Sequence, residues 1–299
     1  MTDNIISKNK KRLLPRVAAL HDLSSFGRCA LTVIIPALSA MRAQCIPIPT
    51  ALLSTHTGGF EGMHFRDLDA DIEKTAEHLD SIGVELDAVY TGFLGSAAQV
   101  RTVEAFIDRF SKNANPLIFV DPVMGDDGEL YSACFPELVL EMRRLIARAH
   151  VITPNLTEAC LLAGESFCDT SALSAEEAGE FAARLMRKIK DFTPAECIIT
   201  GIVTADGVGT YTSCGLHVEK QRGRGYPGTG DLFASVMLGK LLLAERVSAD
   251  TVCRAASFAS EYVAEVIEFS EKYGKDEPMR DGVLLEACLQ TLFDEVKND

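Results

Sequence analysis

The clearest candidate for chemistry in this 299-residue sequence is a glycine-rich turn, Gly228-Thr229-Gly230-Asp231, that leads directly into an apolar helical segment. Gly228 and Gly230 allow backbone conformations that other residues avoid, so N–H groups of the turn and of the first helical turn can point at one spot. The helix dipole adds positive potential there, which suits a transferred phosphoryl group. Asp231 would lie beside that spot and could accept a proton from an attacking hydroxyl. A helix-capping Asp is the common alternative, so this turn alone leaves catalysis open.

Carboxylates gather where another apolar segment ends. In FVDPVMGDDGELY, residues 119–131, Asp121 ends a predicted strand, and Asp126, Asp127 and Glu129 follow it. Mg²⁺ usually keeps several waters and takes one or two protein carboxylates together with phosphate oxygens. Turns are also rich in Asp and Gly for reasons of backbone geometry. The segment therefore indicates either metal and nucleotide binding or an ordinary turn.

A third strand end occurs in VITPNLTEACLLAG, residues 151–164, where Thr153 and Asn155 precede a helical segment that carries Glu158. A Pro at the helix start and a Glu in its first turns make a good capping arrangement. Taken alone, this segment favours that structural interpretation. Its position after a predicted strand is what makes it a candidate for the site.

Two polar, glycine-bearing stretches follow the first two predicted strands: HDLSSFGRCA at 21–30 and STHTGGFEGMHF at 54–65. Asp22, His56 and Thr57 offer hydrogen bonds to a small ligand, and Leu53 offers an apolar contact. Either stretch could equally be a surface loop, and His56 a histidine satisfied by structural hydrogen bonds. The motifs H-E-x-x-H, G-x-S-x-G and G-x-x-x-x-G-K-[ST] are absent, which argues against a hydrolytic zinc site, a serine hydrolase and a P-loop.

Composition narrows the function further. The chain has 29 Lys plus Arg against 43 Asp plus Glu, a formal net charge of -14, which repels nucleic acids and anionic membranes. No apolar run reaches the length of a membrane span. Nine cysteines without a C-x-x-C spacing predict reduced core thiols and a cytoplasmic protein. Residues 1–15 are expected to form a flexible tail.

The elements that must position these residues alternate between short apolar runs and segments of helical spacing, which predicts βα units and a parallel sheet. Strands are expected at 16–20, 44–50, 86–91, 116–121, 149–153 and 196–200. Helices are expected at 29–41, 66–81, 96–111, 135–147, 155–163, 174–190, 229–244, 248–269 and 282–297, with a hairpin at 206–220. This order indicates a doubly wound, three-layer α/β/α fold in a single domain, residues 16–299. In such sheets ligands bind beyond the carboxyl ends of the strands, where the polar segments lie.

Read together, the segments resemble the ribokinase-like superfamily, and within it the pyridoxal/pyridoxamine kinase branch. The resemblance begins near residue 16 and covers nearly the whole chain. It depends on five motifs in order: S-T-H-T-G at 54–58, T-G-F-L-G-S at 91–96, D-P-V-M-G-D at 121–126, T-P-N-L-T-E at 153–158 and G-T-G-D at 228–231. Any one of them could arise by chance, whereas the ordered set is specific.

This resemblance implies transfer of the ATP γ-phosphate to the 5'-hydroxymethyl group of a vitamin B6 vitamer, with Asp231 as general base and the 228–231 turn as anion hole. Contacts with the nucleotide, its phosphates and cations are implied for Asp121, Asp126, Asn155, Glu158, Thr200 and Thr229. Mg²⁺ is implied near Asp126, Thr153 and Glu158, partly through water, and a monovalent cation, K⁺ or Na⁺, near Thr153 and Thr200. The vitamer ring would contact Asp22, Leu53, His56, Thr57, Phe93 and Asp231. Residues 201–226 would cover the nucleotide, and the family suggests a homodimer.

One position departs from the family, because familiar pyridoxal kinases carry a serine where this chain has Asp22. A carboxylate there could pair with a protonated ring nitrogen or amine and change which vitamer is preferred. Hydroxymethylpyrimidine kinase of thiamine synthesis is the alternative within the superfamily. A nucleotide- or vitamer-binding protein without turnover is the alternative from another class, and a sugar kinase fits less well because no segment for an extra lid of strands is evident near the start.

Overall fold

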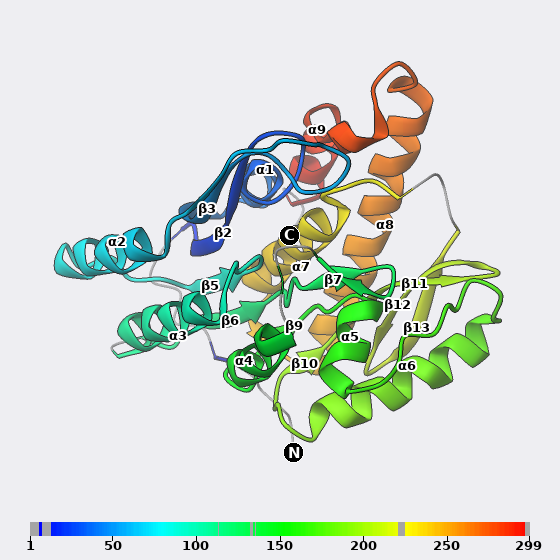
Figure 1. Ribbon diagram of the computed structural model, residues 1–299, viewed down its shortest axis with the longest axis horizontal. Coiled ribbons are helices and arrows are strands. Elements are labelled where there is room, and N and C mark those ends of the chain that lie inside the picture. The colour runs from blue at the N-terminus through cyan, green and yellow to red at the C-terminus, as the bar shows by residue number, and fades with distance from the viewer. Residues whose placement is uncertain are drawn as a thin grey trace.

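A seven-stranded sheet lies at the centre of the computed structural model, which describes residues 6–7, 13–112, 114–131, 134, 136–220 and 225–296 (Figure 1). Its strand order is β10-β9-β6-β5-β2-β3-β4. The strands are β2 (Arg16–Phe26), β3 (Gln44–Thr55), β4 (Phe65–Asp67), β5 (Ala88–Thr91), β6 (Leu117–Val120), β9 (Val151–Ile152) and β10 (Glu196–Cys197). All neighbours pair in parallel except β3 and β4.

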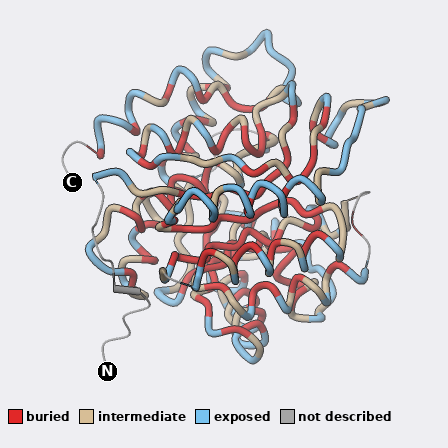
Figure 2. Tube along the Cα trace, turned by 90° about the vertical axis from the view of Figure 1, so that its left-hand side faces the viewer, coloured by how far each residue is buried: buried red, intermediate tan, exposed pale blue. Residues whose placement is uncertain are grey.

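Helices cover both faces of this sheet and make a three-layer structure. One buried cluster joins it to α1 (Leu31–Ala40), α7 (Thr229–Leu243), α8 (Ala249–Tyr273) and α9 (Leu285–Val296). The other joins it to α2 (Asp69–Ser81), α3 (Ala97–Ser111), α4 (Pro136–Ile146), α5 (Leu156–Ala163) and α6 (Ala175–Lys190). Successive side chains of a strand point to opposite faces, so Val17 and Ala19 enter the first cluster and Ala18 and Leu20 the second. Figure 2 shows the buried positions in the interior and the exposed ones on the outer turns.

A smaller antiparallel sheet continues from the edge of the main sheet. It consists of β11 (Ile199–Thr204), β12 (Gly207–Thr212) and β13 (Gly215–Glu219). The hairpin predicted at 206–220 is therefore confirmed. Two short pairs complete the strands: β7 (Gly125–Asp126) with β8 (Glu129–Leu130), and β1 (Ile6–Ser7) with β14 (Arg246–Val247).

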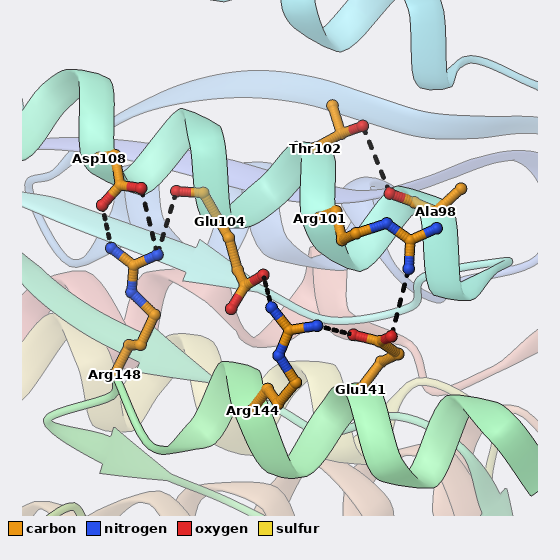
Figure 3. A network of polar contacts seen from close by, with 8 residues as sticks. All are labelled: Ala98, Arg101, Thr102, Glu104, Asp108, Glu141, Arg144 and Arg148. Carbon is orange, nitrogen blue, oxygen red and sulfur yellow. Dashed lines mark hydrogen bonds and ion pairs between the residues drawn. The ribbon is translucent and has the colours of Figure 1, made fainter.

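Exposed ion pairs connect α3 and α4 on the outer surface (Figure 3). Arg144 of α4 contacts Glu104 of α3 at 3.3 Å, and Arg101 of α3 contacts Glu141 of α4 at 3.2 Å. Arg148, just after α4, pairs with Asp108 of α3, and Arg144 also contacts Glu141 within α4 at 2.7 Å. Pairs on an exposed surface contribute little each, typically about 0–1 kcal/mol. Together they help to hold the two helices against each other.

Three sequence-based expectations need correction. The polar stretches after the first two strands are partly strand, since β2 reaches Phe26 and β3 reaches Thr55 and the two pair to that point; mutual pairing satisfies their backbone groups although their residues are polar. In the expected tail, Ile6–Ser7 pairs with β14, while most of residues 1–12 fall outside the described residues. A disulfide joins Cys214 and Cys253, so these two are not reduced thiols as predicted; packing of the β12–β13 turn against α8 brings together cysteines that are 39 residues apart.

No helix among the described residues combines the length and the apolar character needed to cross a membrane.

Candidate active site

The predicted site residues assemble around the carboxyl ends of the central strands. β2 has β3 on one side and β5 on the other, so the winding of the chain reverses between β2 and β5. In doubly wound sheets this switch point is where ligands bind. Asp22 lies at this level, where the β2–β3 register shifts between His21 and Leu23, and Asp121 follows β6 directly. Such irregularities often redirect side chains next to active sites.

The 228–231 turn begins α7 at this edge. Gly228 has φ 78°, and a Cβ on it would lie 2.1 Å from the carbonyl oxygen of Arg28. Glycine is therefore required for the turn to approach the loop between β2 and α1. A Cβ on Gly230 would meet nothing within 4 Å, so the turn has open space in front of it. Thr229 supports the turn by donating from Oγ1 to the Tyr226 carbonyl at 2.9 Å.

Asp231 lies in the first turn of α7, with its side chain 16% exposed. The Ala30 N–H donates to Oδ2 at 2.7 Å, and Nδ1 of His21 lies 3.9 Å from Oδ1. Burial raises the pKa of Asp231 to about 7 and repulsion from Asp22 adds to the rise, while the Ala30 hydrogen bond opposes it. A carboxyl group with this pKa can exist in both protonation states near neutral pH, which suits an acid–base role.

A second group of carboxylates lies beside Asp231. Asp121 is 7% exposed and accepts a hydrogen bond from Thr153 Oγ1 at 3.1 Å. Burial first, and then the charge of Asp231, raise the pKa of Asp121 to about 8. Burial followed by the charge of Asp121 raises the pKa of Glu158 well above its usual value. The exposed Asp126 also has a raised pKa, mainly through partial burial of its carboxylate.

Glu158 forms the capping arrangement that its sequence context favoured. Its Oε2 accepts from the Asn155 N–H at 2.8 Å, its Oε1 accepts from the Met124 N–H at 3.0 Å, and Asn155 Oδ1 accepts from the Glu158 N–H at 2.9 Å. Asn155 also donates from Nδ2 to the Gly125 carbonyl at 2.8 Å, which ties β7 to α5. The Thr200 N–H donates to the Pro154 carbonyl at 2.9 Å, so Thr200 lies next to this cap.

The donor set fits a hard cation such as Mg²⁺. After burial, the charges of Asp121 and Asp126 raise the pKa of Glu158, and a cation among the three carboxylates would relieve that repulsion. Within the described residues, however, no three His, Cys, Asp or Glu ligand atoms here lie within 4.8 Å of one another; the trio that does, His217, Glu219 and Glu261, lies between β13 and α8. A cation at the site would therefore need phosphate oxygens and waters to complete its shell.

The residues predicted to contact the ring of a small substrate differ in what they can offer. Asp22 is 8% exposed and accepts from Ser24 Oγ at 3.1 Å, and burial raises its pKa to about 6. Both nitrogens of His56 are engaged: Nδ1 accepts from the Gly58 N–H at 3.1 Å and Nε2 donates to the Arg280 carbonyl at 2.7 Å. Structural hydrogen bonds therefore satisfy both of its ring nitrogens. Leu53 and Phe93 are buried, and Thr57 is exposed.

The structure also adds a contact that sequence reasoning did not assign to the site. The Ala30 N–H anchors Asp231 across 201 residues of sequence. Ala30 has a positive φ of 46° as the residue before α1, a conformation that is rare for alanine. The sequence signal for this contact was weak: Gly27 and Arg28 indicate a turn between a strand and a helix. Because every residue except proline has a backbone N–H, residue type could not identify Ala30 as the donor.

Comparisons with known proteins show which family the chain belongs to. The family described as phosphomethylpyrimidine kinase matches residues 35–278. A protein of Bacteroides thetaiotaomicron, provisionally named a phosphomethylpyrimidine kinase, is 37% identical with a TM-score of 0.83, covering 95% of this chain and 96% of that one; another crystal form of it contains pyridoxal. Pyridoxal kinase from Lactobacillus plantarum is 29% identical with a TM-score of 0.78, over 95% and 99% of the two chains. A pyridoxine/pyridoxal/pyridoxamine kinase of Bordetella avium is 29% identical over 85% of each chain.

Proposed function

Because the chain belongs to the phosphomethylpyrimidine kinase family, we propose that it transfers the γ-phosphate of ATP to the 5'-hydroxymethyl group of a vitamin B6 vitamer. The expected ribokinase-like fold and the kinship with pyridoxal kinases are confirmed by the same comparisons. The observation that carries the proposal is the position of Asp231, held by Ala30 at the N-terminus of α7 beside the open turn at Gly230. The pyridoxal in the 37% identical relative supports a B6 vitamer as acceptor.

In this mechanism the N–H groups of residues 228–231 and the dipole of α7 hold the γ-phosphoryl group. Asp231 accepts the hydroxyl proton as the bond to phosphorus forms. Positioning and fixed dipoles then supply most of the rate enhancement, because phosphoryl transfer needs little covalent participation by the protein. Since burial raises the pKa of Asp231 to about 7, activity should rise as the pH increases through that value.

The carboxylates next to Asp231 have a separate role in this proposal. Asp121, Asp126 and Glu158, with Thr153, would hold Mg²⁺ through phosphate oxygens and water, and the cation would neutralise charge on the phosphates. Asn155 keeps this region in place by joining β7 to the start of α5.

The nucleotide would extend from Thr229 and Thr200 under the segment 201–226. That segment includes β12 and β13, while residues 221–224 lie outside the described part. Thr200 pairs with Asn155 beside the cap, which supports a role for Thr200 in nucleotide contact. With Thr153 it would line a K⁺ or Na⁺ path. We further propose a homodimer, as the resemblance implies.

The ring of the vitamer would lie between the strand ends and the loop after β3. Asp22 would pair with a protonated ring nitrogen or amine, which would compensate the charge that burial disfavours at this position. Leu53 and Phe93 would supply apolar contact and Thr57 a hydroxyl. Because the nitrogens of His56 are occupied, its contribution would come from the ring itself.

Hydroxymethylpyrimidine kinase stays the second candidate, because the family description names a phosphomethylpyrimidine. The two acceptors present a similar hydroxymethyl group to Asp231 and differ in what Asp22 would contact. A binding protein without turnover is the third candidate, and ATP consumption that depends on the acceptor separates it from both kinases.

The test incubates purified protein and Mg-ATP with pyridoxal, pyridoxamine, pyridoxine or hydroxymethylpyrimidine, and measures ADP release and phosphorylated product. We expect a B6 vitamer to be phosphorylated and Asp231→Asn to lower kcat by roughly 10²- to 10⁴-fold, the usual contribution of a general base. Asp250→Asn is the matched control, because Asp250 also lies in the first turn of a helix but is exposed and pairs with Arg254.

Product from the pyrimidine alone would move the protein to the second candidate. Absence of turnover with every acceptor would favour the binding protein. Near-normal turnover of Asp231→Asn would refute the base assignment while leaving the phosphotransferase activity standing.

A further inference from the structure

His21 is a buried imidazole next to Asp231 that the mechanism above does not use. It lies on β2 two residues after Ala19. Its side chain therefore points to the same face of the sheet as those of Val17 and Ala19, the face that α7 covers. Its side chain is 1% exposed. A Cβ on Gly92 would lie 1.7 Å from Cε1 of the ring, and the Tyr90 ring meets the imidazole edge to face with centroids 4.4 Å apart. The absence of a side chain at position 92 thus creates the space that the imidazole fills.

The two oxygens of Asp231 have different neighbours. The Ala30 N–H holds Oδ2 at 2.7 Å, and Nδ1 of His21 is 3.9 Å from Oδ1. This second separation exceeds a hydrogen bond. Catalytic hydrogen bonds are often long without bound substrate and tighten in the reacting complex. A small rotation of Asp231 about its side-chain bonds would bring Oδ1 within reach of Nδ1.

The protonation state of His21 follows from its surroundings. Burial lowers its pKa to about 3, so the imidazole is neutral and carries one N–H. Nε2 is buried without a hydrogen-bond partner among the described residues, whereas Nδ1 faces a carboxylate. A proton on Nδ1 can be donated to the carboxylate of Asp231. A proton on Nε2 would instead leave a buried N–H without an acceptor, which is unfavourable.

We propose that His21 is a positioning residue for the general base, with Nδ1–H donating to Oδ1 of Asp231 in the reacting complex. This inference depends on the proposed function, in which Asp231 accepts the hydroxyl proton. Together with the Ala30 N–H, the imidazole would fix the plane of the carboxylate and favour its ionised form. Lone pairs that these two donors leave free would then face the substrate hydroxyl.

The other groups around Asp231 do not favour its ionisation. They come from every neighbouring element: Asp22 on β2, Cys29 before α1, Tyr90 on β5, Asp121 after β6 and Tyr131 after β8. The carboxylates repel a charge on Asp231, and burial keeps the thiol and phenols neutral by raising their pKa. A neutral donor such as His21 stabilises the carboxylate here without introducing a buried positive charge.

The test compares His21→Asn with His21→Leu, two side chains of nearly the same shape. Asparagine can place an amide N–H where Nδ1 lies, whereas leucine places a methyl group there. We expect His21→Leu to lower kcat by roughly 10- to 100-fold, as for the loss of a hydrogen bond to a charged group, with little change in the KM for ATP. His21→Asn should recover most of that loss. Equal kcat values for the two variants, whether both low or both normal, would overturn the proposal.

A measurement on the unaltered side chain covers the case in which His21→Leu does not fold. Nitrogen-15 NMR of histidine-labelled protein, with His21 assigned through His21→Asn, reports which ring nitrogen carries the proton. We expect a neutral Nδ1–H form near neutral pH whose signal shifts in Asp231→Asn. A proton on Nε2, or a signal that Asp231→Asn leaves unchanged, would contradict the inference.

Asp231→Asn assayed in parallel separates the two levels of the argument. If that variant turns over normally, the proposed base assignment has failed. If it is inactive while His21→Leu and His21→Asn have the same kcat, only the role of His21 has failed.

Discussion

Gly228 and Gly230 flank Thr229 in one turn, yet alanine at the two positions should have opposite effects on stability. At Gly228 an alanine would have to adopt φ 78°, which costs about 1–2 kcal/mol for an L-residue. Its Cβ would also lie 2.1 Å from the Arg28 carbonyl oxygen, so the backbone of the neighbouring loop must shift. At Gly230, inside α7 with open space around the Cβ, alanine should stabilise the helix by up to about 1 kcal/mol.

The free energies of unfolding of Gly228→Ala and Gly230→Ala should therefore differ by roughly 1–3 kcal/mol, the sum of these two contributions, and the contact with Arg28 should widen the difference. Urea unfolding measures this difference, with equal m values as the check that both variants unfold alike. Activity should follow a different order. Gly230→Ala puts a methyl group into the space proposed for the phosphoryl group, so its kcat should fall although its fold is at least as stable as that of the wild type.

Two results would refute this reasoning. If Gly228→Ala is as stable as Gly230→Ala, the turn does not approach the Arg28 loop as closely as the structure has it. If Gly230→Ala retains wild-type kcat, the open space before the turn does not hold the transferred group.

Three further predictions concern titration, specificity and covalent structure. Folding raises the pKa of Asp121 from 3.8 to about 8 and that of Asp231 from 3.8 to about 7. The stability that the protonated carboxyl groups contribute is therefore complete below pH 3.8, decreases as the pH rises from 3.8, and is lost once the pH has passed 7 to 8. The melting temperature without ligands should therefore fall over this range, and Asp121→Asn should reduce the fall; an equal fall in both proteins would contradict the assignment. Asp22→Ser should change the ratio of kcat/KM for pyridoxamine and pyridoxal, and an unchanged ratio would mean that Asp22 does not contact the distinguishing groups. Reduction of the Cys214–Cys253 bond, or Cys253→Ser, should lower the free energy of unfolding by about 2–4 kcal/mol, and urea curves that coincide with and without dithiothreitol would exclude that contribution.

Much of the fold could be predicted because it follows local rules. The apolar runs from Val17 to Leu20 and from Leu117 to Val120 are buried strands, and the helical segments carry their own start signals, such as the Ser174 and Asn155 capping boxes. Where polar residues continue a strand, as in the last residues of β2 and β3, local pattern was insufficient, since pairing between the two strands decides the outcome.

The same division applies to the candidate site. The sequence by itself determined the chemical groups: a glycine turn that opens a helix, Asp231 at its start, and carboxylates after successive strands. Only the tertiary structure decided what these groups contact, because hydrogen bonds such as Ala30 N–H to Asp231 join residues far apart in the chain. Burial likewise depends on what packs around a group, so the raised pKa of Asp231, the engaged nitrogens of His56 and the enclosed imidazole of His21 are properties of the folded protein.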